Sequence, residues 1–505
     1  MSAHALVKRL NFHKYLRGGS LCPPIFLQFG KKPGIIFIWK TKAKPTAPQR
    51  CKRLMRTAKL ITMGCKVNQY DTQSMRETLR RNGYTLLDDE TPRQGADLYL
   101  INTCTVTNTA DQKARQVIRR AIRQHPNAKV LVTGCYAESD REAIEEIPGV
   151  TFVFGNREKA DFQHYLDLLH TETPSPTAET AHTPNPLLTI EPVQHNAIRE
   201  HARFSKGVSD AGKRTRALIK VQDGCSAFCT YCIIPYVRGR MTSRPLDDIT
   251  DEAHRIAESG IKEVVITGVH LGAYGMDTSR DRDIADILAH IHDIEGIERI
   301  RFSSIEPMYF PDTLGERMAA LPKCMPHFHL PVQAGSDEIL RQMRRRYTTA
   351  QFAHLVENLR RVFGDDVGIT TDIMVGFPGE TDVHFEESCQ FVKEIGFSQL
   401  HVFRYSPRKG TPAATYPNQV SPHVAAARSQ TMIALGERLN TAFRQRMLGK
   451  QKEVLIEASR EGQNNHLAGF TDNYLRVLVD APESAINQIQ RVTLGALEGD
   501  CIAAA

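Results

Sequence analysis

Short apolar runs alternate with amphipathic stretches through the first part of the chain. Each run is long enough for one buried strand, and each following stretch has the spacing of apolar positions that is typical of a helix. This alternation predicts a doubly wound α/β domain with a parallel sheet, over residues 55–165. The expected strands are KLITMG, DLYLINT and KVLVTG, and the expected helices lie at 71–83, at 109–124 and in ESDREAIEEIPG.

The same alternation recurs six times between residues 214 and 405. Six strand–helix units predict a barrel-like sheet, about three-quarters of a TIM barrel, within a domain of residues 213–448. Its first helix is expected from about Leu246 to Glu258, with Ser243 as the N-cap. The expected strands are ALIKVQ, EVVITGV, RIRFSSI, HFHLPV, GITTDIMV and QLHVFRY.

Two changes of pattern mark the remaining segments. Residues 166–212 include TETPSPTAETAHTPNP, whose Pro and Thr content and lack of apolar periodicity predict a linker. A long helix-like stretch runs from His423 to Leu448. The short alternating runs after it, VLIEA, LRVLVD and RVTLGAL, predict a small β-barrel over residues 449–505.

Charge is unevenly placed along the 505 residues, whose formal net charge is +8. Residues 1–54 contain twelve Lys or Arg and no Asp or Glu, which leaves residues 55–505 with a net charge of −4. Global charge therefore gives no argument for nucleic-acid binding. We expect this basic leader not to be part of the native protein, with translation starting at Met55; an organellar transit peptide is the alternative. The longest apolar run, GIIFIW, is too short to span a bilayer, so no membrane association is expected.

Three of the eleven cysteines stand together after the first expected barrel strand. Cys225, Cys229 and Cys232 have the spacing C-x3-C-x2-C, and Tyr231 places a bulky side chain beside the last of them. Cubane iron–sulfur clusters usually have four thiolate ligands, so three ligands leave one iron open for a small molecule. Structural zinc is the alternative, but no fourth Cys or His follows at finger spacing. This spacing resembles the radical S-adenosylmethionine (SAM) signature, which implies SAM at the open iron and makes the three cysteines catalytic.

Three further cysteines each follow an expected strand of the first domain. Cys65, Cys104 and Cys135 are far apart in the chain, yet the carboxyl ends of parallel strands lie on one edge of a sheet. The three thiols should therefore converge and hold a second metal cluster. The alternative is that they are three unrelated buried cysteines, as we expect for Cys324, Cys389 and Cys501.

The segments around these cysteines resemble a known family. MGCKVNQYDTQ, INTCTVTNTADQKARQVIRRAIR and VTGCYAE are similar to the N-terminal domain of the radical SAM methylthiotransferases, and the resemblance covers roughly residues 57–480. The most similar branch acts on N6-threonylcarbamoyladenosine at position 37 of bacterial tRNA. The resemblance implies two [4Fe-4S] clusters, SAM, transfer of a methylthio group to C2 of that base, and a C-terminal TRAM-like module that holds RNA. It also implies a flavodoxin- or ferredoxin-type electron donor and a cytoplasmic location.

Several motifs at the carboxyl ends of the expected barrel strands fit SAM binding. Function in TIM-like barrels lies at this end. Each motif taken alone is typical of an ordinary turn, but together they form one rim. The candidate SAM-binding residues, besides Tyr231, are Gly268, Ser304, Glu306, Gln333 and Gly376.

RNA contacts rest on weaker patterns. Arg115, Arg119 and Arg123 share one helix face, and a second basic cluster contains Arg341, Arg344, Arg345 and Arg346. Phe470 and Tyr474 could stack on bases or pack in a core. The candidates for binding the threonylcarbamoyl group are Arg238, Arg240 and Arg404.

Three other functions stay open from the sequence. A methylthiotransferase could act instead on isopentenyladenosine in tRNA, or on an aspartate side chain of a ribosomal protein. A non-catalytic iron–sulfur protein that binds RNA or carries electrons is the third.

Overall fold

The computed structural model describes residues 56–87, 95–171, 203–205, 207–209, 211–212, 214–278 and 282–505. The expectation for the basic leader and most of the expected linker lie outside these residues. All of the described residues belong to the unit Met55–Ala505.

The N-terminal domain is built on one parallel sheet of five strands in the order β2-β1-β3-β4-β5. The three apolar runs expected to be strands form β1, β3 and β4, and β3 is buried along its whole length. The strands are β1 (Thr57–Thr62), β2 (Thr85–Leu87), β3 (Leu98–Thr103), β4 (Lys129–Gly134) and β5 (Phe152–Val153). The helices are α1 (Lys66–Arg81), α2 (Asn108–Gln124), α3 (Cys135–Ser139), α4 (Arg141–Glu145) and α5 (Phe162–Thr171).

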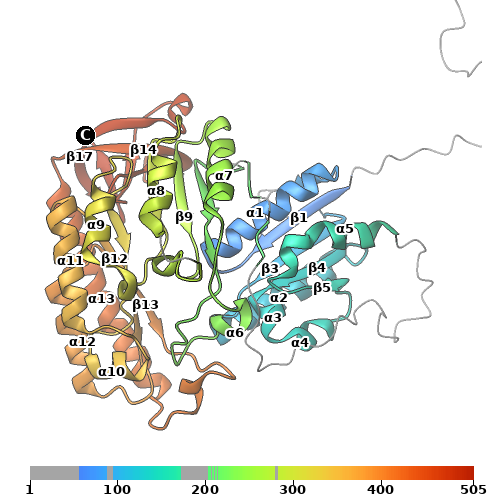
Figure 1. Cartoon of the computed structure of the whole chain (residues 1–505), viewed down its shortest axis with the longest axis horizontal. Helices are drawn as coiled ribbons and strands as arrows, with labels where there is room; N and C mark the ends of the chain where they lie inside the picture. Colours follow the sequence, from blue (N-terminus) through green and yellow to red (C-terminus); the bar gives the residue numbers. More distant parts are fainter. Residues whose placement is uncertain are drawn as a thin grey trace, which may run out of the picture. The chain divides into compact units, whose positions relative to one another are not determined.

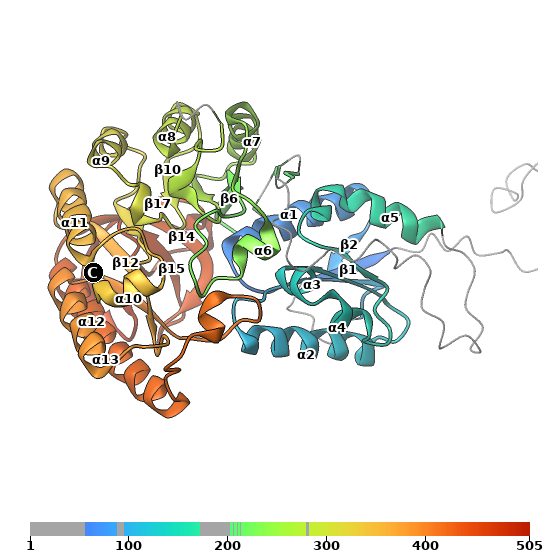
Figure 2. The same cartoon turned by 60° about the horizontal axis from the view of Figure 1, so that its bottom comes forward.

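Helices cover both faces of this sheet, as a doubly wound fold requires. One apolar core joins the sheet to α1 and α5 through residues such as Met75 and Leu166. A second core joins the opposite face to α2 and α4 through Ile118 and Ile144. Helix α5 continues to Thr171, past the domain boundary expected at residue 165. Figures 1 and 2 show α1 and α5 together, away from α2 and α4.

Six parallel strands form the central barrel-like sheet. They pair as two sets, β10-β9-β6 and β11-β12-β13, and backbone bonds such as Ile305 N–H to the His329 oxygen (3.0 Å) join the sets. The strands are β6 (Arg216–Lys220), β9 (Glu263–Thr267), β10 (Arg299–Phe302), β11 (His327–His329), β12 (Gly368–Val375) and β13 (Gln399–Arg404). This confirms the partial barrel expected from the sequence.

Helices cover the outer side of the six-stranded barrel and share one large apolar core with it. They are α7 (Leu246–Glu258), α8 (Ile284–His292), α9 (Asp312–Ala319), α10 (Asp337–Gln342), α11 (Thr349–Phe363), α12 (Asp382–Ile395) and α13 (Pro422–Met447). A short helix, α6 (Ile234–Arg238), and the pair β7 (Gln222–Asp223) and β8 (Thr242–Ser243) flank the loop after β6.

The expected N-cap Ser243 is wrong. Ser243 lies in β8, and its hydroxyl oxygen accepts a hydrogen bond from the Gly275 N–H (2.9 Å). Pro245 directly precedes α7. A proline just before the first turn has a φ suited to starting a helix, so the chain needs no serine cap there.

The last strands close into a small barrel of order β14-β15-β16-β18-β17. They are β14 (Gln451–Glu461), β15 (His466–Thr471), β16 (Arg476–Val479), β17 (Ile489–Glu498) and β18 (Cys501–Ala504). Phe443 and Met447 at the end of α13 complete its core.

Two buried arginines of β10 fasten this C-terminal barrel to the six-stranded barrel. Arg299 donates to the backbone oxygens of Phe470 (3.1 Å) and Glu453 (2.8 Å). Arg301 donates to those of Asp472 (2.8 Å) and Thr471 (3.0 Å). Glu263 of β9 compensates their charge, since its carboxylate lies 3.0 Å from Arg301. The C-terminal barrel therefore lies at the amino ends of the barrel strands.

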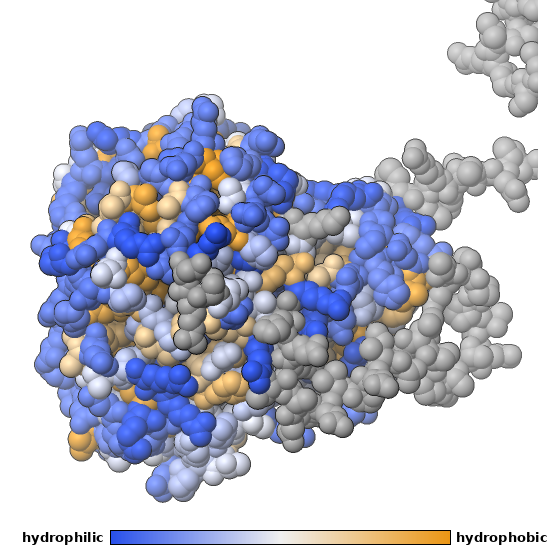
Figure 3. All heavy atoms as spheres, in the orientation of Figure 1, coloured by the Kyte–Doolittle hydropathy of each residue, from blue (hydrophilic) through white to orange (hydrophobic). Residues whose placement is uncertain are grey.

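Hydrophilic residues dominate the face of the molecule shown in Figure 3, with small hydrophobic patches between them. Among the described residues, no helix has both the length and the apolar character needed to cross a bilayer.

Candidate functional site

Cys225, Cys229 and Cys232 lie in one loop at the carboxyl end of the first barrel strand. Gly224, just before this loop, has a φ of +69°, and a Cβ there would collide with the backbone oxygen of Arg240. The Cys225 N–H donates to the Gly239 oxygen (3.0 Å), and the Cys232 N–H donates to the Cys229 oxygen (3.0 Å). The loop is therefore tightly folded, and it needs glycine at its entrance.

The three thiols lie close enough to influence one another. Burial raises the pKa of Cys225 to about 12, and the neighbouring Cys229 contributes in the same direction. Burial also raises the pKa of Cys232 well above its usual value, and the neighbouring Cys229 and Cys225 raise this pKa further. Raised pKa values favour the protonated thiols, so the three cysteines would become thiolates only beside a strong positive charge. A metal cluster supplies such a charge, so the donor set fits one.

Arg345 and Glu306 lie beside these cysteines. Arg345 is almost fully buried; it donates to the Cys229 sulfur (3.5 Å) and forms an ion pair with Glu306. The sequence placed Arg345 in a surface cluster for RNA, and this is wrong. Arg344 has a φ of +57°, which ends the helical path after α10 and turns the next side chain inward. Arg341, Arg344 and Arg346 remain exposed.

Buried polar atoms without a partner lie at the carboxyl ends of the barrel strands, and one of them belongs to a residue beside Cys225. The His270 Nδ1 is 3.6 Å from the Cys225 sulfur, while its Nε2 has no partner among the described residues. Thr267 Oγ1 and Ser303 Oγ, at the ends of β9 and β10, are also buried without a partner there. Buried polar groups are normally satisfied, so this rim fits a ligand that supplies hydrogen-bonding atoms.

The other expected SAM-binding residues lie along this rim with various local roles. Tyr231 packs against the barrel core, and Ser304 is half-buried. Gln333 has a φ of +73°, and its N–H bonds the Asp372 oxygen (2.9 Å). At Gly376, whose φ is +75°, Ala425 of α13 occupies the space that a Cβ would take. Gly268 lies in a turn held by Gln222. Contact with SAM stays a prediction for all of them.

Cys104 and Cys135 come directly after β3 and β4, and Cys65 follows β1 after Met63 and Gly64. Cys65 precedes α1, and Cys135 is the first residue of α3. Gly64 has a φ of +92°, and any Cβ there would strike the Cys104 side chain. The fold thus brings the three residues to one sheet edge.

Their electrostatics support this proximity. Burial raises the pKa of Cys104 to about 11, and Cys135 and Cys65 raise it further. Within the described ranges, no three His, Cys, Asp or Glu side chains already stand in a geometry that could hold a metal ion. The residue types and their common edge fit a cluster, while the holding of one stays a prediction.

Helix α6, just after Cys232, packs on α3, which begins at Cys135. Asn156 bridges them: its side-chain nitrogen donates to the Val237 oxygen (2.8 Å) and lies 3.7 Å from the Cys135 sulfur. The two cysteine sets therefore lie on neighbouring elements of two different domains.

Arg238 of α6 is buried at this junction. It donates to Asp223 (2.9 Å) and to Asn68 of α1 (2.6 Å). The pKa of Asp223 lies below its usual value despite burial, because Arg238 and Lys220 stabilise the carboxylate. Arg238 was expected to bind the threonylcarbamoyl group. Its Nη1 and Nη2 already have partners, whereas its buried Nε has none among the described residues, so this role stays a prediction. Arg240 and Arg404 are exposed, and their role stays a prediction.

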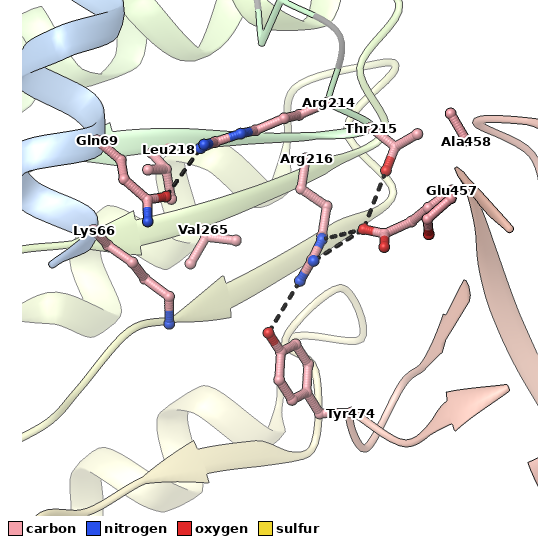
Figure 4. Close-up of a pocket in the computed structure, with 11 residues that line it drawn as sticks. Lys66, Gln69, Arg214, Thr215, Arg216, Leu218, Val265, Glu457, Ala458 and Tyr474 are labelled. Atoms are coloured by element: carbon pink, nitrogen blue, oxygen red, sulfur yellow. Dashed lines mark hydrogen bonds and ion pairs between the residues drawn. The ribbon is translucent and has the colours of Figure 1, made fainter. Parts of the chain in front are cut away.

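Two cavities lie between α1, the six-stranded barrel and the C-terminal barrel. Their volumes are about 400 and 760 Å³. Lys66 and Tyr474 line both cavities, and Figure 4 shows the smaller one. Tyr474 stacks on Phe470 and on His327, with 4.5 Å between ring centroids in each pair. The two aromatic residues are therefore packed in a domain junction and also border open space.

The basic face of α2 is only partly free. Arg115 donates to the Tyr136 hydroxyl (2.5 Å), whereas Arg119 and Arg123 are exposed. The remaining cysteines behave as expected for Cys324 and Cys389, which are buried; Cys501 is part-exposed.

Known proteins match the chain over most of its length. Residues 219–392 match the Radical SAM superfamily, and residues 57–155 match a family described as uncharacterized protein family UPF0004. The threonylcarbamoyladenosine tRNA methylthiotransferase MtaB of Bacillus subtilis is 38% identical, over 87% of this chain and 94% of that protein. Its namesake in Thermotoga maritima is 35% identical over 80% and 87%. The tRNA-2-methylthio-N(6)-dimethylallyladenosine synthase of Akkermansia muciniphila is 33% identical over 85% and 94%.

A solved structure shares the fold. The radical SAM methyltransferase TsrM from Kitasatospora setae, solved with cobalamin and a [4Fe-4S] cluster, has a TM-score of 0.50 at 18% identity. The match covers 72% of this chain and 77% of that one. Given the identity and coverage of its relatives, together with two cysteine sets at the ends of parallel strands, this chain belongs to the radical SAM methylthiotransferase family.

Proposed function

We propose that this protein transfers a methylthio group to C2 of N6-threonylcarbamoyladenosine at position 37 of tRNA. The relatives with this named activity match nearly their whole length at 35–38% identity. The observation that carries the proposal is the packing of α6 on α3, because it sets one cysteine site beside the other. A reaction that needs both a radical and a sulfur donor requires such proximity.

The barrel cysteines would hold a [4Fe-4S] cluster with SAM at its open iron. Together these supply the 5′-deoxyadenosyl radical that an unactivated aromatic C–H bond requires. The residues around the barrel cysteines would bind and orient the cluster and SAM. Arg345 holds Glu306 and one cysteine sulfur in place, and the unpaired Nε2 of His270 offers a hydrogen bond to the ligand. Gly268, Ser304, Gln333 and Gly376 complete the proposed SAM site.

Cys65, Cys104 and Cys135 would hold a second [4Fe-4S] cluster that carries the sulfur to be inserted. A second SAM provides the methyl group. Lys159 and Arg238 lie near Cys135, where they compensate negative charge. The C-terminal barrel would act as the TRAM-like module that holds RNA, electrons would come from a flavodoxin- or ferredoxin-type protein, and the reaction would take place in the cytoplasm.

Mass spectrometry of tRNA nucleosides tests the proposal. Purified, anaerobically reconstituted protein is incubated with SAM, a reductant and tRNA that carries threonylcarbamoyladenosine. We expect its 2-methylthio derivative to appear. We also expect at least about a hundredfold less product from the same tRNA with plain adenosine, because buried polar groups in the site would lose their partners.

Relatives that act on dimethylallyladenosine are 33% identical to this chain, so tRNA with that base belongs in the same assay. Product from that tRNA alone would refute the proposed substrate.

A further inference from the structure

Lys66 is the residue that joins the N-terminal cysteine site to the two cavities. It directly follows Cys65 and is the first residue of α1. Its side chain is exposed, yet it borders both cavities rather than the outer surface alone. Cavities of this size are typical of small-molecule sites and can hold a nucleoside.

Lys66 differs from the other strongly basic side chains around these cavities because it makes no hydrogen bond or ion pair within the described part of the chain. Figure 4 shows no dashed line from its ammonium group to any of the residues drawn. The other lysine or arginine side chains that line the cavities have these partners: Arg214 with Gln69, Arg216 with Glu457 and Tyr474, Arg444 with Gly499, and Arg476 with Glu457 and Glu461.

The surroundings of Lys66 favour an anionic guest. Arg216 and Arg301 lie near enough to interact electrostatically with it, and Asp372 is the acidic residue acting on it from the barrel side. Asp372 already lies 3.3 Å from the His329 ring nitrogen. An ammonium group that borders a cavity without a carboxylate partner attracts a carboxylate from a ligand.

The position of Lys66 fits one part of the proposed substrate. In threonylcarbamoyladenosine, a single ring nitrogen separates C2, the carbon that receives sulfur, from C6, the carbon that carries the modified N6. Consecutive Cα atoms are about 3.8 Å apart, so Lys66 starts beside the sulfur site at Cys65 and extends away from it. The N6 substituent of a base lies on the same side of the ring as C2. A base with C2 near Cys65 can therefore extend this substituent into the cavities that Lys66 borders.

The geometry points to Lys66 as the residue that binds the threonyl carboxylate and so selects the substrate base. This inference rests on the proposed function and adds the group that reads the modification. The dimethylallyl group has no charge and would leave the ammonium group unpaired. A phosphate of the tRNA backbone is the other anion that Lys66 could bind, and the experiment separates the two.

The test measures binding of anticodon stem-loop RNA to the anaerobically reconstituted protein by fluorescence anisotropy. One RNA carries threonylcarbamoyladenosine at position 37, and the other carries the same group with its carboxylate converted to an amide. The wild-type protein should bind the acid about ten- to a hundredfold more tightly than the amide, the range for a hydrogen bond between charged groups. Lys66→Met should reduce this ratio to about one, and Lys66→Arg should restore most of it.

Lys129→Met is the matched control, because Lys129 is exposed at the amino end of β4, on the opposite edge of the same sheet. It should keep the wild-type ratio. Equal weakening of both RNAs by Lys66→Met would assign Lys66 to a phosphate and overturn the inference, as would a wild-type ratio of one. The latter comparison needs no variant, so it stands even if Lys66→Met fails to load a cluster.

The proposed function fails separately, in the nucleoside assay. Wild-type protein that never methylthiolates threonylcarbamoyladenosine would refute that function, whatever the binding ratio.

Discussion

The two cysteine sites are built in opposite ways. The barrel site takes Cys225, Cys229 and Cys232 from a loop of eight residues, so their proximity is set locally. The N-terminal site takes Cys65, Cys104 and Cys135 from the ends of three strands, so their proximity depends on the pairing of the whole sheet. A local site should tolerate damage elsewhere in the fold, whereas a sheet-edge site should fail with its sheet.

The two sites also differ in their nearest charges. The barrel site has the buried pair of Arg345 and Glu306. The N-terminal site lies beside a cluster in which Lys159 and Lys220 contact Asp71 at 3.0 and 2.6 Å. That cluster spans both domains, so the N-terminal site is also the one more closely tied to domain docking.

Removing each set of thiols should give the largest difference between the sites. Replacing Cys225, Cys229 and Cys232 by Ala should reduce iron from about eight to about four per chain and abolish cleavage of SAM to 5′-deoxyadenosine. Replacing Cys65, Cys104 and Cys135 should also leave about four irons but preserve SAM cleavage. Iron analysis and chromatography of 5′-deoxyadenosine measure both. Unchanged iron in the second variant would mean that the N-terminal site holds no cluster.

Replacing one glycine near each cysteine site should damage that site without damaging the other. Gly134→Ala forces a side chain at a φ of +103° into the Thr103 backbone, and Gly224→Ala forces one into the Arg240 backbone. Each should cost about 3 kcal/mol locally and lower the iron content of its own site only. Gly83→Ala is the control: its φ is +79° with no atom near the new Cβ, so about 1 kcal/mol is expected. Thermal unfolding and iron content report both effects.

Substitution of Arg345 tests whether the buried ion pair with Glu306 supports the barrel site alone. Arg345→Met leaves Glu306 without its partner, so we expect a loss of about 3 kcal/mol and slower SAM cleavage, with the N-terminal iron retained. Arg341→Met, which removes an exposed arginine of the same segment, should change neither quantity measurably. Equal effects of the two substitutions would argue against the inward role of Arg345.

Arg238 tests the link between the sites and should give the smallest effect. Arg238→Lys keeps the charge but has a single side-chain nitrogen, so it cannot contact Asp223 and Asn68 from two separate nitrogens as Arg238 does. Both clusters should load and SAM cleavage should continue, while methylthiolation falls about tenfold, since one charged hydrogen bond contributes roughly 1.5 kcal/mol or more. Arg317→Lys, at an exposed ion pair, is the control. A parallel loss of SAM cleavage would show that Arg238 does not act through the alignment of the two sites.

The sequence predicted the elements that carry continuous patterns. The apolar runs before Cys65, Cys104 and Cys135 are strands, and their parallel order followed from the helices between them. Both cysteine sets could therefore be placed from the amino-acid pattern alone, because strand ends and loop spacing are local or topological properties.

The directions of individual arginines could not be predicted in the same way. Arg345 and Arg238 stand in runs that look like solvated surface, yet both are buried against carboxylates that lie outside those runs. Glu306 is 39 residues from Arg345, so no local pattern connects them. The one available signal was the chain position of Glu306 at a strand end. Lys66 was missed for a similar reason, since an open cavity between domains has no sequence pattern.

The attachment of the C-terminal barrel through Arg299 and Arg301 has a consequence for evolution. These guanidinium groups donate hydrogen bonds to backbone oxygens of residues 453 and 470–472, and not to the side chains of those residues. Most substitutions at those positions preserve the carbonyl groups and so preserve the attachment. The surface of this module can therefore change in sequence without weakening its attachment to the six-stranded barrel, and modules exchanged between relatives should remain attached.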